Sequence, residues 1–339
     1  MLRFGAVLLI VLAATAEGGS PVTDASMAPS AGLLLVANKG DHTLGIIDPA
    51  AGRQVATVEE SGTTGHEVIA SPDGRTAYVP IYGNSGVGKA GTDGQTMDVI
   101  DIASRRRVAT IDFGRPERPH CPLFGRDGRL YVTSEVTNTI TVVDPRTNQI
   151  VERIPTGQAE SHMLALTRDG KRAYTSNVGV GTVSAIDLGA KKVVAVIPVA
   201  VKAQRLALSV DDRWAFTADT AEPRLAVIDT ATNQVKQWVS LPGIAYGTAP
   251  TPDGRWLVIA LISVNKVAVL DLKSMQVART IDVPKAPQEV LVRPDGRFAY
   301  VSCDASHQVA AIDTKDWKVD RLIEAGPYAD GLAWAAARP

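Results

Sequence analysis

The histidines are the residues of this chain best suited to chemistry near neutral pH, because an imidazole can ligate a metal, polarise a carbonyl or transfer a proton. The chain contains five of them among 339 residues. Three share one spacing, each lying seven residues before the aspartate of a short turn: His66 before Asp73, His120 before Asp127 and His162 before Asp169. This spacing indicates three equivalent positions in a repeated structure.

The turn aspartates mark an internal repeat that runs along most of the chain. They are Asp73, Asp127, Asp169, Asp211, Asp253 and Asp295. The last five follow one another at intervals of 42 residues, whereas the first interval is 54 residues. A second set of aspartates, each ending an apolar run, recurs in the same phase: Asp48, Asp101, Asp144, Asp187, Asp229, Asp271 and Asp313. Two independent marks in one phase establish the repeat.

Each repeat predicts four short strands. Residues 162–197 contain "HMLALT", "RAYTSN", "TVSAIDL" and "VVAVI", separated by turn-forming residues. Four antiparallel strands in a repeated unit of about 40 residues are typical of a β-propeller blade. The fold class is therefore all-β, a seven-bladed β-propeller with four antiparallel strands per blade. We expect residues 31–339 to form this single domain, closed by the N-terminal strands pairing with the C-terminal strand in one shared blade.

All five histidines map to one face of the predicted propeller. The first strand of a blade starts at this face, and the loop between its second and third strands returns to it. His66, His120 and His162 lie at the start of first strands, beside the central channel, whereas His42 and His307 lie in the returning loops. The other blades carry different residues at the first-strand position: Gln204, Tyr246, Gln288 and Asp330.

The funnel at this face is the candidate ligand site. Its candidate members are His66, Glu67, Arg118, His120, Glu160, His162, Gln204 and Asp330, with His42 and His307 farther out. A divalent metal is the candidate cofactor, and His66, His120 and His162 are its candidate ligands, because three imidazoles from adjacent blades could point at one axial pocket. It remains open whether each imidazole instead only hydrogen-bonds a neighbouring strand. No residue is assigned a catalytic role.

The longer first interval reflects an insertion, carried by "YGNSGVGKAGTDGQ" at residues 82–95. It falls in a loop between second and third strands, on the histidine face. Two interpretations stand, a flap over the funnel or an insertion that the fold merely tolerates. The glycines Gly86, Gly88 and Gly91 match a dinucleotide-binding fingerprint as text only, because no helix follows them.

Several strands carry a recognisable family signature. The segments "LYVTS" (130–134), "AYTSN" (173–177) and "AYVSC" (299–303), with "TVVDPRTNQIVERIPTG" (141–157), resemble the YVTN-repeat, YncE-like propellers of exported bacterial proteins. The resemblance covers almost the whole chain and implies a seven-bladed propeller. It also implies a binding or cell-surface role, although some related propellers are lactonases or lyases.

Two functions therefore stand at this point. In the first, the protein binds a small molecule or a protein partner on the histidine face and in the central funnel. In the second, it is a lactonase- or lyase-type enzyme that uses a divalent metal or a His–Glu pair in the funnel.

The N-terminus predicts export. Arg3 precedes an apolar run at residues 6–14 and small residues that suit cleavage, so residues 1–16 are expected to be a signal peptide and residues 17–30 a flexible segment. The mature protein should be periplasmic or extracellular, with no membrane span. Its two cysteines, Cys121 and Cys303, lie too far apart in the repeat to predict a disulfide. The net charge of −1 gives no indication of nucleic-acid binding. We expect the protein to be a monomer.

Overall fold

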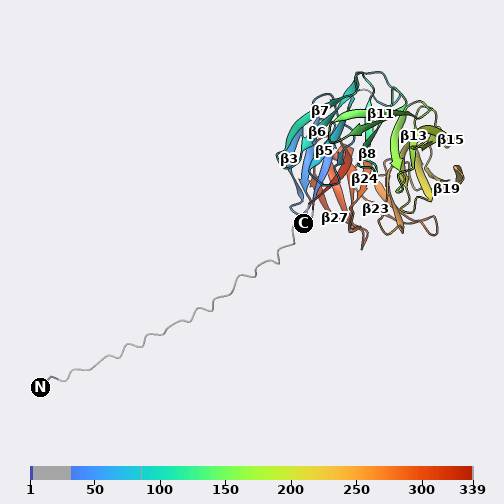
Figure 1. The fold of residues 1–339 in the computed structure, drawn as a ribbon. Helices are drawn as coiled ribbons and strands as arrows, with labels where there is room; N and C mark the ends of the chain where they lie inside the picture. The colour runs from blue at the N-terminus through green and yellow to red at the C-terminus, as the bar shows by residue number, and fades with distance from the viewer. Residues whose placement is uncertain (3–31, 85, 338–339) are drawn as a thin grey trace.

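The chain folds into a ring of seven four-stranded antiparallel sheets, as seen in a computed structural model that describes residues 1–2, 32–84 and 86–337 (Figure 1). The seven-bladed prediction is confirmed. The predicted signal peptide and flexible segment lie outside the described residues, apart from the first two residues. No helix of the described part of the chain is long and apolar enough to cross a membrane.

The blades are numbered here in chain order, and their strands run from the channel outward. Blade 1 holds β28 (Ala329–Ala336), β1 (Gly32–Asn38), β2 (Thr43–Asp48) and β3 (Arg53–Glu59). Blade 2 holds β4 (Ile69–Ala70), β5 (Thr76–Gly83), β6 (Asp93–Asp101) and β7 (Arg106–Asp112). Blade 3 holds β8 (Pro119–Phe124), β9 (Leu130–Ser134), β10 (Thr139–Asp144) and β11 (Gln149–Pro155). Blade 4 holds β12 (Ser161–Leu166), β13 (Arg172–Asn177), β14 (Thr182–Asp187) and β15 (Lys192–Pro198).

The remaining three blades follow the same pattern. Blade 5 holds β16 (Ala203–Leu208), β17 (Trp214–Asp219), β18 (Arg224–Asp229) and β19 (Gln234–Ser240). Blade 6 holds β20 (Ala245–Pro250), β21 (Trp256–Leu261), β22 (Lys266–Asp271) and β23 (Gln276–Asp282). Blade 7 holds β24 (Pro287–Val292), β25 (Phe298–Cys303), β26 (Gln308–Asp313) and β27 (Lys318–Glu324), with the short 3-10 helix η1 (Asp304–Ser306) between β25 and β26.

The ring closes through blade 1, where the last strand of the chain pairs with the first. β28 runs antiparallel to β1, with Leu34 opposite Trp334 and Leu35 opposite Ala333. The innermost strands of neighbouring blades also pack against each other all the way around the channel. Shared-blade closure is therefore confirmed, and it leaves no open sheet edge where the ring begins and ends.

The aspartate turns between first and second strands are held mainly by main-chain hydrogen bonds. In each, the carboxylate accepts a hydrogen bond from the amide two residues later, as Asp169 does from Lys171 at 2.9 Å. The basic residue of the turn makes only a loose contact with the aspartate, with 4.0 Å between Arg75 and Asp73. In blades 5 and 6 the turn arginines lie over Trp214 and Trp256.

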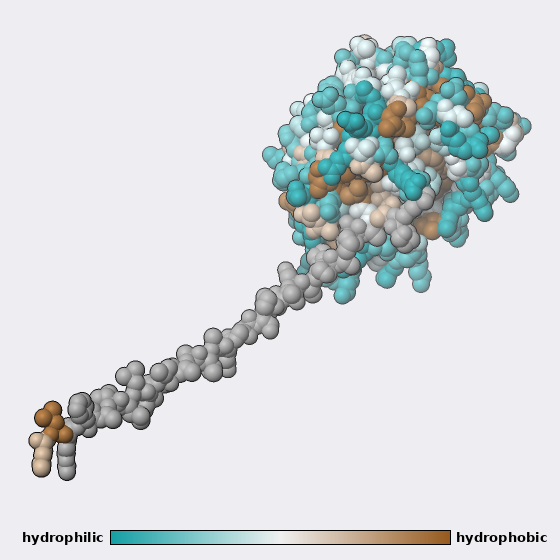
Figure 2. Space-filling view, turned by 60° about the vertical axis from the view of Figure 1, so that its left-hand side comes forward, coloured by the Kyte–Doolittle hydropathy of each residue, from teal (hydrophilic) through white to brown (hydrophobic). Residues whose placement is uncertain are grey.

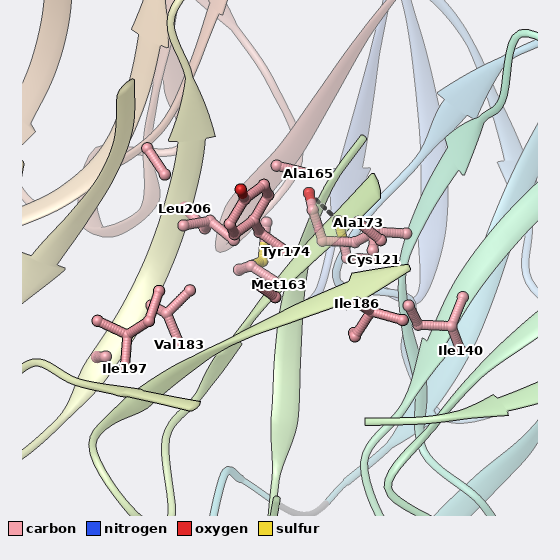
Figure 3. Close-up of a cluster of buried hydrophobic side chains, with 14 of the residues drawn as sticks. Cys121, Ile140, Met163, Ala165, Ala173, Tyr174, Val183, Ile186, Ile197 and Leu206 are labelled. Atoms are coloured by element: carbon pink, nitrogen blue, oxygen red, sulfur yellow. Dashed lines mark hydrogen bonds between the residues drawn. The ribbon is translucent and has the colours of Figure 1, made fainter. Parts of the chain in front are cut away.

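Apolar side chains fill the spaces between adjacent blades. Between blades 3 and 4, for example, Ile140 of β10 and Met163 and Tyr174 of blade 4 belong to one buried cluster (Figure 3). The outermost strands alternate between exposed and half-buried residues, which suits an edge that faces solvent. Both cysteines are free and buried. On the surface, apolar residues are scattered among polar ones (Figure 2).

A β-bulge interrupts the first strand of nearly every blade at its channel end. In blade 4 the pairing shifts between Ser161 and Met163, so that His162 is the extra residue. The same shift occurs between Pro119 and Pro122 in blade 3, and between Ala203 and Leu206 in blade 5. A bulge bends the strand and redirects side chains. These bulges place His120, Cys121, His162, Gln204 and Arg205 at the channel.

The ring closure makes a first testable prediction. A chain that ends at Gly326 lacks β28, so the edge of β1 that faces the channel is left unpaired. This chain should lose cooperative thermal unfolding in circular dichroism. A chain that ends at Ala336 removes only three residues and should unfold as the full chain does. Equal unfolding of both truncations would contradict the closure.

Candidate functional site

Three imidazoles meet at one end of the central channel. The ring centroids of His120 and His162 are 3.9 Å apart, and those of His66 and His120 are 5.7 Å apart. The phenol ring of Tyr82, from β5, stacks on His66 at 4.4 Å and meets the edge of His120 at 5.2 Å. Rings from blades 2, 3 and 4 thus form one contiguous group.

A carboxylate completes this group. Glu135, in the loop after β9, is buried, and its Oε1 contacts Nδ1 of His162. Its Oε2 accepts a hydrogen bond of 2.7 Å from the hydroxyl of Tyr82. We call His66, Tyr82, His120, Glu135 and His162 the mouth cluster. Both carboxylate oxygens have defined partners, so the orientation of Glu135 is fixed.

Burial lowers the pKa of two of the mouth histidines, His66 and His120. It lowers the pKa of His66 to about 3, and it lowers the pKa of His120 well below the usual range, with the other imidazoles and Arg205 adding to the effect. Neutral imidazole is the form that accepts protons and ligates metals. Cys121, beside His120, is no nucleophile, because burial raises its thiol pKa strongly.

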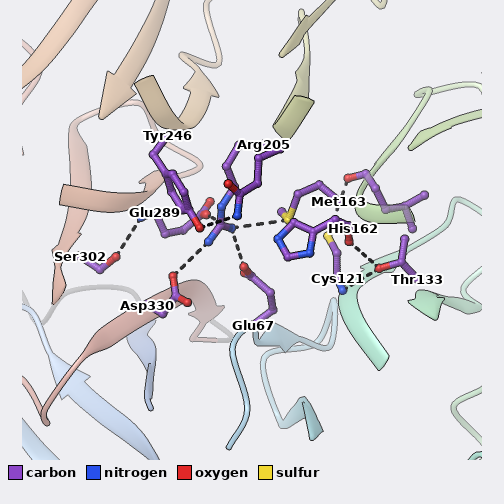
Figure 4. A network of polar contacts seen from close by, with 12 residues as sticks. Glu67, Cys121, Thr133, His162, Met163, Arg205, Tyr246, Glu289, Ser302 and Asp330 are labelled. Atoms are coloured by element: carbon purple, nitrogen blue, oxygen red, sulfur yellow. Dashed lines mark hydrogen bonds and ion pairs between the residues drawn. The ribbon is translucent and has the colours of Figure 1, made fainter. Parts of the chain in front are cut away.

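A second polar group lies next to the mouth cluster and is centred on Arg205, which is only 2% exposed. Its guanidinium binds Glu67 and Glu289 at 2.5 Å each and Asp330 at 3.0 Å, and it lies over the ring of Tyr246 (Figure 4). Arg205 comes from blade 5, and the three carboxylates come from blades 2, 7 and 1. One side chain therefore joins four blades across the channel.

Lys39 extends this group toward blades 1 and 7. Its ammonium lies 3.0 Å from Asp330 and 3.1 Å from Asp304. We call Arg205, Lys39, Glu67, Glu289, Asp330 and Asp304 the Arg205 network. It contains four carboxylates and two cations, so it carries an excess of two negative charges when all are ionised.

The excess of carboxylates shows in their pKa values. Burial raises the pKa of Glu67 to about 8 and also raises that of Glu289, although Arg205 opposes both shifts. Burial disfavours the charge of Asp330 as well, but Lys39 and Arg205 together hold its pKa below the usual range. The network therefore holds a proton near neutral pH, and this proton is carried by Glu67 or Glu289.

The insertion of blade 2 crosses onto blades 3 and 4 beside the mouth cluster. Arg118, two residues before His120, donates to Asp93 at 2.5 Å and to the main-chain oxygen of Lys89 at 2.8 Å. Gly88 approaches Glu160 so closely that a Cβ there would lie 3.1 Å from the carboxylate. Arg118 and Glu160 thus hold the insertion, and the guanidinium of Arg118 also lies over the ring of Tyr82, 5.9 Å from its centroid. This placement favours the interpretation of the insertion as a cover.

The structure brings together some of the predicted site residues and not others. His66, His120 and His162 converge, and Glu67 and Asp330 lie beside them in the Arg205 network, while Gln204 donates to the hydroxyl of Tyr246 at 2.7 Å. His42 and His307 are exposed and stay apart from the cluster; the ring of His307 lies 5.9 Å from that of Tyr328. His42 and His307 lie at the ends of the returning loops, next to the third strands, whereas Lys39 and Glu135 lie at the starts of such loops, next to the second strands.

The predicted three-histidine metal set stays a prediction, and the structure brings a different group of possible ligands closest together. Among the described residues, the group whose ligand atoms lie within 4.8 Å of one another is His120, Glu135 and His162. His66 stands outside this group because its ring is stacked on Tyr82. A carboxylate takes the place that the sequence assigned to the third imidazole.

The sequence analysis missed Glu135, Tyr82, Lys39 and Arg205. The first three share a repeat position, four residues after the second-strand position occupied by Tyr78, Tyr131 and Leu35. Arg205 shares a position with Glu67 and Glu289, six residues before the turn aspartate. The residue types at these two positions differ between blades, as they do at the histidine position. A comparison of the blades at these positions could therefore have identified all four residues.

The fold and site define a seven-bladed β-propeller with a buried histidine–carboxylate cluster at one mouth of its channel. Residues 126–330 match the family model described as "Cytochrome D1 heme domain", and the chain belongs to this family. The narrower YVTN-repeat label stays a prediction.

Relatives and solved structures agree on the architecture. The chain is 31% identical over 140 residues to the seven-bladed beta-propeller protein Rv1057 of Mycobacterium tuberculosis, a match that covers 40% of this chain and 32%, about a third, of that protein. Among solved structures, a Kuenenia stuttgartiensis hydrazine synthase chain has a TM-score of 0.70 at 20% identity, covering 85% of this chain and 94% of that one. The periplasmic gluconolactonase PpgL of Pseudomonas aeruginosa has a TM-score of 0.72 at 19% identity, covering 91% and 99%. At these identities the structures show the fold alone.

A third solved structure shares the fold. It is the dihydro-heme d1 dehydrogenase NirN, with a TM-score of 0.64 at 15% identity, covering 89% of this chain and 75% of that one. The mouth cluster does not fit a haem. His120 and His162 are 1% and 2% exposed and lie against each other, so neither presents a nitrogen to a flat macrocycle. The excess of carboxylates beside them also repels the acidic side groups that haems carry.

The Arg205 network makes a second prediction. Arg205→Met leaves three buried carboxylates without their shared cation, so it should lower the free energy of unfolding by about 3–5 kcal/mol in urea denaturation. Arg53→Met, an exposed change at the start of β3, should shift it by less than about 0.5 kcal/mol. A similar small effect for both would show that the network is not the central cross-link.

A third prediction concerns pH. Because the folded pKa of Glu67 is raised to about 8 from an ordinary value near 4.5, its protonated form stabilises the fold at low pH, and this contribution is lost as pH rises to about 8. From pH 6.5 to 8, wild type should therefore lose up to about 2 kcal/mol of stability relative to Glu67→Gln, because a pKa unit corresponds to about 1.4 kcal/mol. Urea denaturation of both proteins measures this difference. A difference that is flat or rises with pH would contradict the assigned shift.

Proposed function

We propose that this protein is an exported binding protein that holds a small, neutral molecule rich in hydroxyl and carbonyl groups at the mouth cluster. One observation carries the proposal: three imidazoles, a phenol and a carboxylate converge at a place where the other blades carry unrelated residues. Features common to every blade serve the fold, whereas features confined to three adjacent blades serve something else. Export rests on residues 1–16, outside the described part of the chain.

The charges of the mouth support a neutral ligand. His66 and His120 are uncharged at physiological pH, and the cations nearest to them, Arg205 and Lys39, are already bound by carboxylates. An anionic ligand would meet the negative excess of the Arg205 network. Hydroxyl and carbonyl groups can instead exchange hydrogen bonds with neutral imidazoles and with the Gln204–Tyr246 pair on the opposite side.

A second candidate function is hydrolysis of a lactone. The observation that favours it is the buried contact between His162 and Glu135, in which a carboxylate orients an imidazole as it does beside a general base. The likeness to a gluconolactonase in fold agrees with this candidate. A lactone would also satisfy the ligand class proposed for binding.

A fourth prediction tests binding. Isothermal titration of the purified full-length protein with a sugar γ-lactone should show one site, and the open-chain sugar acid should bind at least 10-fold more weakly because of its charge. His66→Ala should weaken lactone binding about 10-fold, which is the loss of roughly 1.4 kcal/mol. His307→Ala, an exposed histidine on the same face, is the matched control and should leave it unchanged.

The outcomes separate the two candidates. If the lactone binds and is also converted to the acid faster than in buffer, and Glu135→Gln abolishes conversion while binding persists, the protein is an enzyme. If wild type binds neither compound, or binds the acid more tightly, the neutral-ligand proposal is wrong.

A further inference from the structure

We propose that His120, Glu135 and His162 form a binding site for one divalent transition-metal ion, which anchors the ligand at the channel mouth. This inference rests on the proposed function, since it names the group through which the mouth would hold its ligand. The ligand atoms of the three residues lie within 4.8 Å of one another. We refer to these three residues as the metal triad.

Two β-bulges and the end of a strand place the three members of the triad. The bulge in β8 turns His120 toward the channel, and the bulge in β12 does the same for His162. Glu135 follows the end of β9, directly beside the second of these strands. The main-chain oxygen of His162 accepts a hydrogen bond of 2.7 Å from the hydroxyl of Thr133, two residues before Glu135. The two ends of the triad are thus tied through the backbone.

A buried nitrogen without a partner points to a missing ligand. His120 is only 1% exposed, and its Nδ1 is buried. No described residue forms a hydrogen bond with this nitrogen. A buried polar atom without a partner destabilises a fold, so most such atoms in native proteins have an explanation. An ion between the three residues supplies a partner for an imidazole that the protein alone leaves unsatisfied.

The orientation of Glu135 agrees with this role. The hydroxyl of Tyr82 donates to Oε2 at 2.7 Å, which leaves Oε1 directed at His162. Metal-bound carboxylates are commonly held in this way by a hydrogen bond to the oxygen that does not ligate. Tyr82 is therefore a positioning residue, and its own ring is fixed by the stack on His66.

The donor set selects the class of metal. Two imidazole nitrogens and one carboxylate oxygen suit zinc, iron(II) or cobalt, whereas calcium and magnesium prefer sites made of oxygen alone. Three protein ligands leave at least one position open for an exogenous ligand. Ligand atoms on a shared zinc ion lie about 3.3 Å apart, so an ion bound through Oε1 of Glu135 and Nδ1 of His162 would replace the direct contact between these two atoms.

The surroundings favour a cation at this place. The Arg205 network carries more carboxylates than cations, and Arg205 acts on His120 electrostatically, so the network and the triad lie within electrostatic range. A divalent ion at the triad would offset negative charge that the protein leaves uncompensated. The simpler alternative is that His162 and Glu135 form only a hydrogen-bonded pair that supports the fold.

The experiment uses the full-length protein without an affinity tag, stripped with a chelator and titrated with Zn²⁺ by calorimetry and with Co²⁺ by visible absorption. We expect one ion per chain, cobalt ligand-field bands in the visible region, and no displacement by excess Ca²⁺ or Mg²⁺. Glu135→Gln and His120→Gln should weaken binding at least 100-fold. Tyr82→Phe should weaken it about 10-fold, within the range that lost outer hydrogen bonds show.

Matched controls separate the triad from adventitious binding. His42→Ala and His307→Ala should each retain zinc affinity within threefold, because both histidines are exposed and neither belongs to the triad or to the mouth cluster. Thermal unfolding of every variant checks that it is folded. For a Gln variant that does not fold, the cobalt spectrum of Tyr82→Phe gives an independent reading, since it should shift while the stoichiometry stays at one.

Two results would overturn the inference. The first is a wild type that binds no zinc in the micromolar range. The second is zinc affinity that is unchanged in Glu135→Gln and His120→Gln but lost in His42→Ala or His307→Ala. Failure here is distinguishable from failure of the proposed function: lactone binding by the metal-free protein would sustain that function without the metal, whereas tight zinc binding with no lactone binding would sustain only the metal site.

Discussion

The guanidinium of Arg205 is the interaction on which the rest of the channel depends. It is buried, and it binds carboxylates that come from three other blades. Taking these charges out of water is costly, so the arrangement is tolerable only while every partner stays in place. Glu67 is one of those partners and is adjacent to His66 in sequence. The main-chain oxygen of His66 also accepts a hydrogen bond of 2.9 Å from Gly331, next to Asp330. The network that joins the blades therefore also positions one edge of the mouth cluster.

The channel end contains two neighbouring groups of residues that differ in charge. The Arg205 network holds four carboxylates and two cations, whereas the mouth cluster consists of aromatic rings with a single carboxylate, and burial keeps its His66 and His120 neutral. Such a division suits a site that holds a cation or a polar neutral molecule rather than an anion. The insertion of blade 2, held by Arg118 and by contact with Glu160, lies beside the mouth cluster.

The repeat allowed the fold to be predicted almost completely, since two sets of aspartates in one phase define the blades, and the shared blade follows from counting strands. The site was predicted only in part. The histidines stood out because a rare residue type recurred at one position. Glu135, Tyr82 and Lys39 were missed because they follow the second strand, where a polar residue resembles an ordinary loop. Arg205 was missed because a regular strand would point it away from Gln204, and only the bulge brings both to the channel. Registers and bulges are set by packing between strands, which a single sequence does not display.

The central claim is that His120, Glu135 and His162 hold a metal ion at the mouth of the channel. Anomalous diffraction from crystals of the protein grown with zinc, recorded on both sides of the zinc absorption edge, tests it most directly. The account predicts one strong anomalous peak bounded by an imidazole nitrogen of each histidine and a carboxylate oxygen of Glu135. A direct hydrogen bond between His162 and Glu135, with no anomalous peak between the three side chains, would contradict it.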